Sequence, residues 1–171
     1  SHASGFYLGN WNSNVSEYAG FPGGNLEMDF YGGYKTTFGD FGLDVGAIYY
    51  YYPGSKYNFT GSTVDNKEIY IGGSWQFLSA KYYYSVADYF SDKGDKNKGT
   101  DGTGYLDLAA TYDLGGGWGG NGHVGHLSYK GRDKADYTDW KLGVTKDVKG
   151  YVFGLAYLGT NARDKAGDWY S

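Results

Sequence analysis

The sequence has no cysteine, only two prolines, and no long apolar run among its 171 residues. Without cysteine the chain can form neither a disulfide scaffold nor a thiolate metal site. No stretch approaches the roughly 18 apolar residues that a transmembrane helix needs. The net charge is −4 and the basic residues are scattered among acids, which argues against a nucleic-acid partner, since such partners select a basic face.

What the chain has in excess is glycine (31 residues) and tyrosine (21 residues). The glycines follow no three-residue period, which excludes collagen, and aromatics at 20% of the chain argue against disorder. Aromatic side chains favour strands, and glycine is suited to places where backbones crowd or turn. The composition therefore favours an all-β protein.

Apolar and polar residues alternate with a period of two at nine places, and no stretch shows a helical period. The clearest example is Leu26–Phe30, where acids separate three apolar residues. The predicted strands lie around residues 6–12, 26–30, 43–49, 69–77, 82–86, 106–112, 121–129, 140–144 and 153–157.

The predicted connections alternate between short and long, which is typical of an up-and-down barrel. Short turns are expected at Gly39–Asp40, near Leu78–Ser79, at Gly115–Gly117 and at Lys149–Gly150. Long polar loops are expected at 14–24, 53–66, 91–103 and 131–136. A sandwich with Greek-key crossovers would not keep that order. We therefore predict an antiparallel up-and-down meander of about nine strands, forming the wall of an outer-membrane-type β-barrel.

The alternation assigns each strand residue to one of two faces. An outward, lipid-facing side would carry Leu26, Met28, Phe30, Leu43, Val45, Ala47, Tyr49, Ile69, Ile71, Trp75, Phe77, Leu106, Leu108, Trp140, Leu142, Val144, Phe153, Leu155 and Tyr157. The expected lumen lining is Glu27, Asp29, Tyr31, Lys35, Asp44, Glu68, Tyr70, Lys81, Tyr83, Asp107 and Lys141. Acids and lysines that face inward together would neutralise charge in a narrow lumen.

Aromatic residues are concentrated near the expected strand ends, as an interfacial girdle requires. They are Phe38, Phe41, Tyr50 to Tyr52, Phe77, Trp118 and Tyr151. A water-soluble barrel or sandwich would show the same alternation with its apolar face turned into a core. The order of the connections and the aromatic placement favour the membrane interpretation.

Several stretches are similar to a known bacterial family. They are Ser4–Tyr7 with Trp11–Val15, Gly24–Tyr34, Phe38–Gly46, Tyr49–Ser55, Ser79–Ser85 and Tyr137–Val144. The chain resembles the proteobacterial conserved hypothetical proteins called Gcw_chp, which are grouped with outer-membrane β-barrels. The resemblance implies barrel architecture and an outer-membrane location, and it brings no catalytic residues.

The family pattern has about two further strands before Ser4 and one after Ser171, which makes about twelve. Residues 1–171 are thus expected to be a single barrel domain that lacks leading and closing strands. An open sheet would leave two unpaired edges, which lipid does not tolerate. The missing strands would come from the rest of a precursor or from another chain.

Few motifs point to chemistry. His123 and His126 are three apart in a predicted strand, so they should point to opposite faces and share no metal. Asp92, Asp95, Asn97 and Asp101 weakly resemble a calcium loop, but interleaved lysines favour a solvated loop. Inward carboxylates are better explained by pairing with Lys35, Lys81 and Lys141 than by catalysis. We expect no catalytic residue, cofactor or metal site, and we expect that the protein is not an enzyme.

Three functions remain open. The first is a porin-like barrel in the bacterial outer membrane that lets small polar solutes pass, or a plugged structural barrel. The second is an accessory subunit that pairs through exposed sheet edges with another protein or a second copy. The third is a soluble secreted protein that binds carbohydrate through its tyrosine- and tryptophan-rich loops. Membrane lipid is the expected partner in the first.

Overall fold

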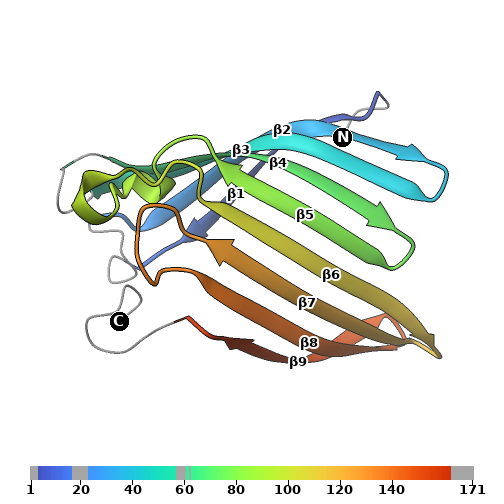
Figure 1. The fold of residues 1–171 in the computed structure, drawn as a ribbon. Coiled ribbons are helices and arrows are strands. Elements are labelled where there is room, and N and C mark those ends of the chain that lie inside the picture. The colour runs from blue at the N-terminus through green and yellow to red at the C-terminus, as the bar shows by residue number, and fades with distance from the viewer. Residues whose placement is uncertain (1–3, 17–22, 57–60, 62, 163–171) are drawn as a thin grey trace.

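Nine antiparallel strands form one sheet in consecutive order (Figure 1). The computed structural model describes residues 4–16, 23–56, 61 and 63–162. The strands are β1 (Phe6–Asn14), β2 (Leu26–Phe38), β3 (Phe41–Lys56), β4 (Thr63–Trp75), β5 (Leu78–Ser85), β6 (Gly104–Gly115), β7 (Trp118–Ser128), β8 (Tyr137–Val148) and β9 (Tyr151–Thr160). Two short 3₁₀ turns, η2 (Tyr89–Ser91) and η3 (Asp95–Asn97), lie between β5 and β6. The predicted all-β meander of about nine strands is confirmed.

Four tight hairpins lie at one end of the sheet, and the described connections β5–β6 and β7–β8 lie at the other (Figure 1). The β8–β9 hairpin turns at Lys149 and Gly150, which both have positive φ, as a type I′ turn requires. The predicted turn near Leu78–Ser79 is two residues too late, because Trp75 pairs with Leu78. The predicted loop 53–66 is too long, since β3 continues to Lys56 and β4 starts at Thr63. Alternation weakens at these positions, but backbone pairing continues.

The sheet curves strongly toward one face, and glycines permit that curvature. The Tyr7 hydroxyl on β1 bonds to the Tyr70 hydroxyl on β4, although β2 and β3 lie between them. Gly33 and Gly46 occupy the intervening positions in register. A Cβ on Gly33 would lie 2.5 Å from the Tyr7 hydroxyl oxygen, and one on Gly46 would lie 2.5 Å from that of Tyr70. The tyrosines therefore lie flat across glycine backbone, on the concave side.

The convex face is apolar and exposed along its whole width. Leu8 on β1 is 90% exposed, Leu142 on β8 is 70% exposed and Leu155 on β9 is 76% exposed. Ile69, Ile71, Leu106 and Leu108 in the central strands are also exposed. The register therefore places the two predicted sets of strand residues on opposite sides of the sheet. We call these two sides the apolar face and the polar face.

Aromatic side chains line the hairpin end of the apolar face. Phe38, Phe41, Phe77, Trp118 and Tyr151 are all exposed there, and Phe41 stacks on Trp75 with ring centroids 6.0 Å apart. The prediction that Tyr50 and Tyr52 belong to this girdle is wrong. Alternation along β3 turns them to the polar face, at the opposite end, where Tyr52 is buried.

The sheet is not closed, because β1 and β9 are its two edges in the part of the chain that the structure describes. Within the same residues, no helix is long and apolar enough to cross a membrane.

Candidate functional site on the polar face

Two adjacent rows of side chains cross the polar face in register. We call the first the tyrosine belt: Tyr7, Tyr70, Tyr83, Tyr105 and Tyr137. We call the second the charge belt: Lys35, Asp44, Lys81, Asp107 and Asp139. Each belt spans most of the sheet because successive strands pair without a bulge at these positions. The two belts are two residues apart along each strand, so hydroxyls of the first can reach charges of the second.

Asp44 on β3 is the centre of one half of the charge belt. Its carboxylate lies 3.0 Å from the Lys81 ammonium and 3.8 Å from the Lys35 ammonium, and it accepts a 2.5 Å bond from the Tyr7 hydroxyl. The Lys81 ammonium also lies 3.7 Å from the Tyr70 ring centroid. Such a contact is attractive because the ring face is electron-rich. Cations on the polar face are thus held by a carboxylate and by the tyrosine belt.

His123 on β7 lies next to the other half of the charge belt and bonds to both of its aspartates. Its Nδ1 lies 2.9 Å from Asp107 Oδ1 and its Nε2 lies 2.7 Å from Asp139 Oδ1. The Tyr105 hydroxyl donates to Asp139 Oδ2 at 2.9 Å. An imidazole between two carboxylates can donate to both only when both ring nitrogens carry a proton. The arrangement therefore favours an imidazolium, which balances the two acids.

His126 points the other way, as its spacing from His123 predicts. Its Nδ1 lies 2.9 Å from the Thr138 hydroxyl, on the apolar face. The described residues contain no group of three or more histidine, aspartate or glutamate side chains that could hold a metal ion.

The sequence-predicted lining residues all share the polar face, but their pairing differs from the expectation. They are Glu27, Asp29, Tyr31, Lys35, Asp44, Glu68, Tyr70, Lys81, Tyr83, Asp107 and Lys141. Only Asp44 pairs with the predicted lysines. Glu68 instead accepts a 2.9 Å bond from the Asn66 amide, near the loop end of β4. Among the described residues Lys141 has no ion pair, so the prediction that it neutralises an inward acid is wrong.

At the loop end, residues 86–103 and 129–136 fold into one unit, which we call the rim cluster. Its centre is Asp92, which is 2% exposed. Arg132 binds that carboxylate through Nη2 and through Nε at 2.7 Å, and the Tyr129 hydroxyl donates to it at 3.0 Å. Arg132 also reaches Asp95 at 3.2 Å. Burial raises the pKa of the Tyr129 hydroxyl, so it remains a donor. The prediction of a solvated loop is therefore wrong at Asp92.

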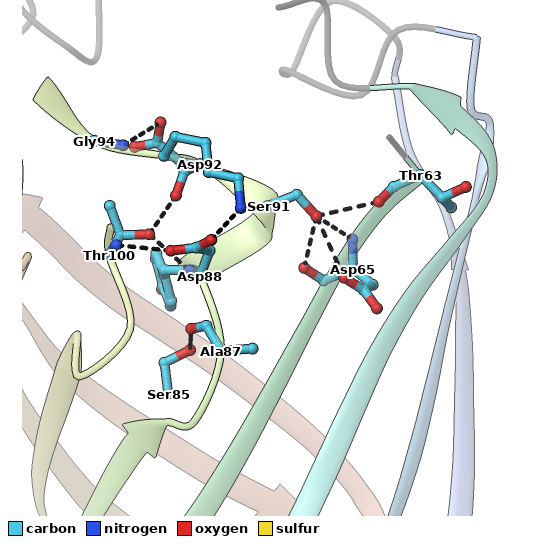
Figure 2. A network of polar contacts seen from close by, with 11 residues as sticks. Thr63, Asp65, Ser85, Ala87, Asp88, Ser91, Asp92, Gly94 and Thr100 are labelled. Carbon is cyan, nitrogen blue, oxygen red and sulfur yellow. Dashed lines mark hydrogen bonds and ion pairs between the residues drawn. The ribbon is translucent and has the colours of Figure 1, made fainter. Parts of the chain in front are cut away.

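Further polar bonds fasten the rim cluster to β4 and to itself (Figure 2). The Ser91 hydroxyl lies 3.1 Å from the Thr63 carbonyl oxygen and accepts from the Asp65 amide at 3.1 Å. The buried Thr100 hydroxyl donates to the Asp92 carbonyl at 2.5 Å. These bonds join segments up to about 30 residues apart in sequence, so the loop has one conformation imposed by several elements.

Asp88 closes the same network on its exposed side (Figure 2). Its carboxylate accepts from the Lys93 ammonium at 2.5 Å and from the Thr100 amide at 2.9 Å. These two donors hold the pKa of Asp88 below its usual range, although partial burial opposes them.

A family model described as a bacterial protein of unknown function, Gcw_chp, matches residues 1–169. The chain belongs to the Gcw_chp family. No curated protein and no solved structure matched the sequence. The resemblance expected from Ser4–Tyr7, Gly24–Tyr34 and the later motifs is thereby confirmed for nearly the whole chain of this Gcw_chp protein.

Two features of the Gcw_chp protein are absent from the sequence-based prediction. His123 was considered only as a metal ligand with His126, whereas its partners Asp107 and Asp139 lie on neighbouring strands. Alternation assigns Asp107 and Lys141 to the inward face, and Asp139 lies two residues before Lys141 on the same side. That signal could have found the partners of His123 once strand order was fixed. Arg132 lies in a stretch assigned only as a polar loop, and no local pattern pairs it with Asp92.

Proposed function

We propose that the chain forms the wall of a bacterial outer-membrane β-barrel whose polar face lines an aqueous interior through which small polar solutes pass. The observation that carries this proposal is the exposed apolar face. Leu142 and Leu155, with Ile69 and Leu106, have no protein layer over them in the described part of the chain. Soluble monomers rarely expose apolar patches of more than a few hundred Å², whereas barrel strands present such a face to lipid.

The polar face supports the aqueous side of the proposal. Lys35 and Lys81 pair with Asp44, and His123 bonds to Asp139, which suits a narrow interior where unpaired charges would be only partly hydrated. A hollow of about 390 Å³ borders Asp44, with Lys35, Lys81, Ser74 and Ser79 among its lining residues. Water and polar solutes can occupy such a space. The hairpin-end aromatics would then lie at the membrane interface.

The open edges favour a second candidate. Backbone groups of β1 and β9 that stayed unpaired in lipid would be costly, so each edge favours a partner strand. If another chain supplies that strand, the molecule is an accessory subunit that pairs through its edges.

The test is to express the full-length protein in a Gram-negative host, fractionate the membranes, and reconstitute the purified protein in planar bilayers. We expect recovery in the outer-membrane fraction, release only by detergent, and discrete conductance steps. Recovery as a soluble protein without detergent would overturn the membrane proposal. Membrane recovery without conductance would overturn passage and favour the subunit candidate.

A further inference from the structure

A row of aromatic rings crosses the polar face at the loop end. Phe90 lies against Tyr50 and Tyr52 of β3, with centroids 5.7 and 5.9 Å apart. Its neighbour Tyr89 lies 4.7 Å away, edge to face, and contacts Tyr129, just after β7, at 5.2 Å. We call Tyr89 and Phe90 the crossbar, because they connect β3 with the end of β7 through ring contacts alone.

The crossbar takes a short path across the curve of the sheet. Adjacent strands lie about 4.8 Å apart, so β3 and β7 are about 19 Å apart along the sheet. The Tyr89 and Phe90 rings span this width on the polar side of the sheet, and the short turn that carries them lies close to β4. Tyr89 also packs on the small core of Leu127, Tyr129 and Ala135. Such a row occupies space that would otherwise be open at this end.

The crossbar is held in place rather than loosely attached. Ser91, the next residue, is bonded to β4, and Asp92 after it is bound by Arg132. Phe90 and Ser91 have φ of 47° and 61°, a region that costs non-glycine residues about 1 kcal/mol or more. A conformation of that cost persists only where surrounding contacts impose it. The surroundings therefore direct two aromatic side chains onto the polar face.

We propose that Tyr89 and Phe90 form the size-limiting constriction of the interior at the loop end, excluding bulky solutes while small polar ones pass. This inference rests on the proposed function, since it names the residues that set its selectivity. The crossbar and the tyrosine belt below it present aromatic faces and hydroxyls. The constriction therefore selects by size and passes small polar molecules of either charge.

Because residues 1–171 contain no cysteine, a single introduced thiol can report access to the interior. Ser79 lies on the polar face near the hairpin end and is exposed, so Ser79→Cys places one thiol beyond the crossbar. Whole cells expressing the full-length protein are treated with a small thiosulfonate reagent or with a bulky biotin maleimide. The same measurement is made in Tyr89→Ala, Phe90→Gly and the double variant. Glycine at 90 suits the positive φ and so preserves the loop.

We expect the bulky reagent to label Ser79→Cys several-fold faster in the double variant, while the small reagent labels both backgrounds equally. The matched control is Phe38→Ala, which removes an exposed ring on the apolar face at the hairpin end. It should change the labelling rate of neither reagent. Equal rates for the bulky reagent with and without the crossbar would overturn the constriction.

Single-channel conductance of the same proteins separates this inference from the proposed function. A larger conductance in the double variant supports both. No conductance in any protein, together with faster bulky labelling, would overturn passage but leave the crossbar as the barrier to access. Conductance that is equal in wild type and double variant, with unchanged labelling, would overturn the crossbar alone.

Discussion

Replacing Arg132 by alanine should open the rim cluster without unfolding the sheet. The guanidinium makes two bonds to Asp92 and one to Asp95, and the Arg132 and Asp92 side chains are 17% and 3% exposed. Removing one partner of a buried pair leaves an uncompensated charge, which costs about 3–5 kcal/mol. Without Arg132, the Tyr129 hydroxyl and the Gly94 amide still donate to Asp92, but both are neutral and do not balance its charge. The strands pair independently of this site.

The opened loop offers a protease readout. Lys93, Lys96 and Lys98 are exposed trypsin sites within it. When closing is fast relative to cleavage, the rate of cutting follows the population of the opened state. A loss of 3 kcal/mol raises that population about 100-fold. We therefore expect trypsin to cut Arg132→Ala between residues 93 and 98 about 100-fold faster than wild type, until the loop is fully open.

The matched control is Lys130→Ala in the same rim cluster. Its ammonium lies 3.7 Å from Asp101, and both side chains are more than half exposed. Such a surface pair contributes about 0–1 kcal/mol, so cutting should accelerate less than about fivefold. Arg132→Lys should lie between the two, because an ammonium lacks the planar fork. Cutting of Arg132→Ala at the rate of Lys130→Ala would refute the assignment of Asp92–Arg132 as the bond that holds the loop closed.

Three further expectations follow from the faces and the loop. Gly125→Ala should lower the free energy of unfolding by about 1–3 kcal/mol, because the new Cβ overlaps the Tyr105 hydroxyl. Gly122→Ala on the same strand makes only ordinary van der Waals contacts and is the control, and thermal unfolding compares the two variants. Leu142→Lys, at the middle of β8 on the apolar face, should lower the free energy of unfolding in a bilayer by about 2–4 kcal/mol. Ser79→Lys on the polar face should lower it far less. Equal unfolding midpoints of the two variants in lipid vesicles would contradict a lipid-facing Leu142. The pKa of Asp88 is lower in the folded protein than in the unfolded chain, where it is about 4. The stability that Asp88 gives the rim cluster is therefore fully present above about pH 4 and is lost as the pH falls through the lowered pKa of the folded state. Amide hydrogen exchange of the rim cluster, corrected for intrinsic rates, should show a loss of protection at low pH in wild type and no such loss in Asp88→Asn.

Alternation along single strands was enough to predict the architecture and the division into two faces. Leu26–Phe30 and Leu106–Leu108 have this period, and a one-residue slip would move every side chain to the other face. The lining residues from Glu27 to Lys141 are therefore found together on one side. Which of them touch was not predictable, because contact depends on register between strands.

The errors have a common physical cause. Position near a strand end predicts that Tyr50 and Tyr52 belong to a girdle, but as even-numbered residues of β3 they lie on the polar face. The lysines beside Asp92 predict a solvated loop, but its partner Arg132 lies 40 residues further along the chain. Long-range pairing of loops leaves no periodic signal. Local composition therefore describes the strands better than the rim cluster.

The pairing of tyrosine with glycine has a consequence for how relatives of this chain can diverge. A flat ring occupies the volume that a side chain on the next strand would need, as at Tyr105 and Gly125. Neither position can change size alone without a collision or an empty space. Across the family, gains in bulk at position 125 should accompany losses at position 105, so the two columns of an alignment should vary together.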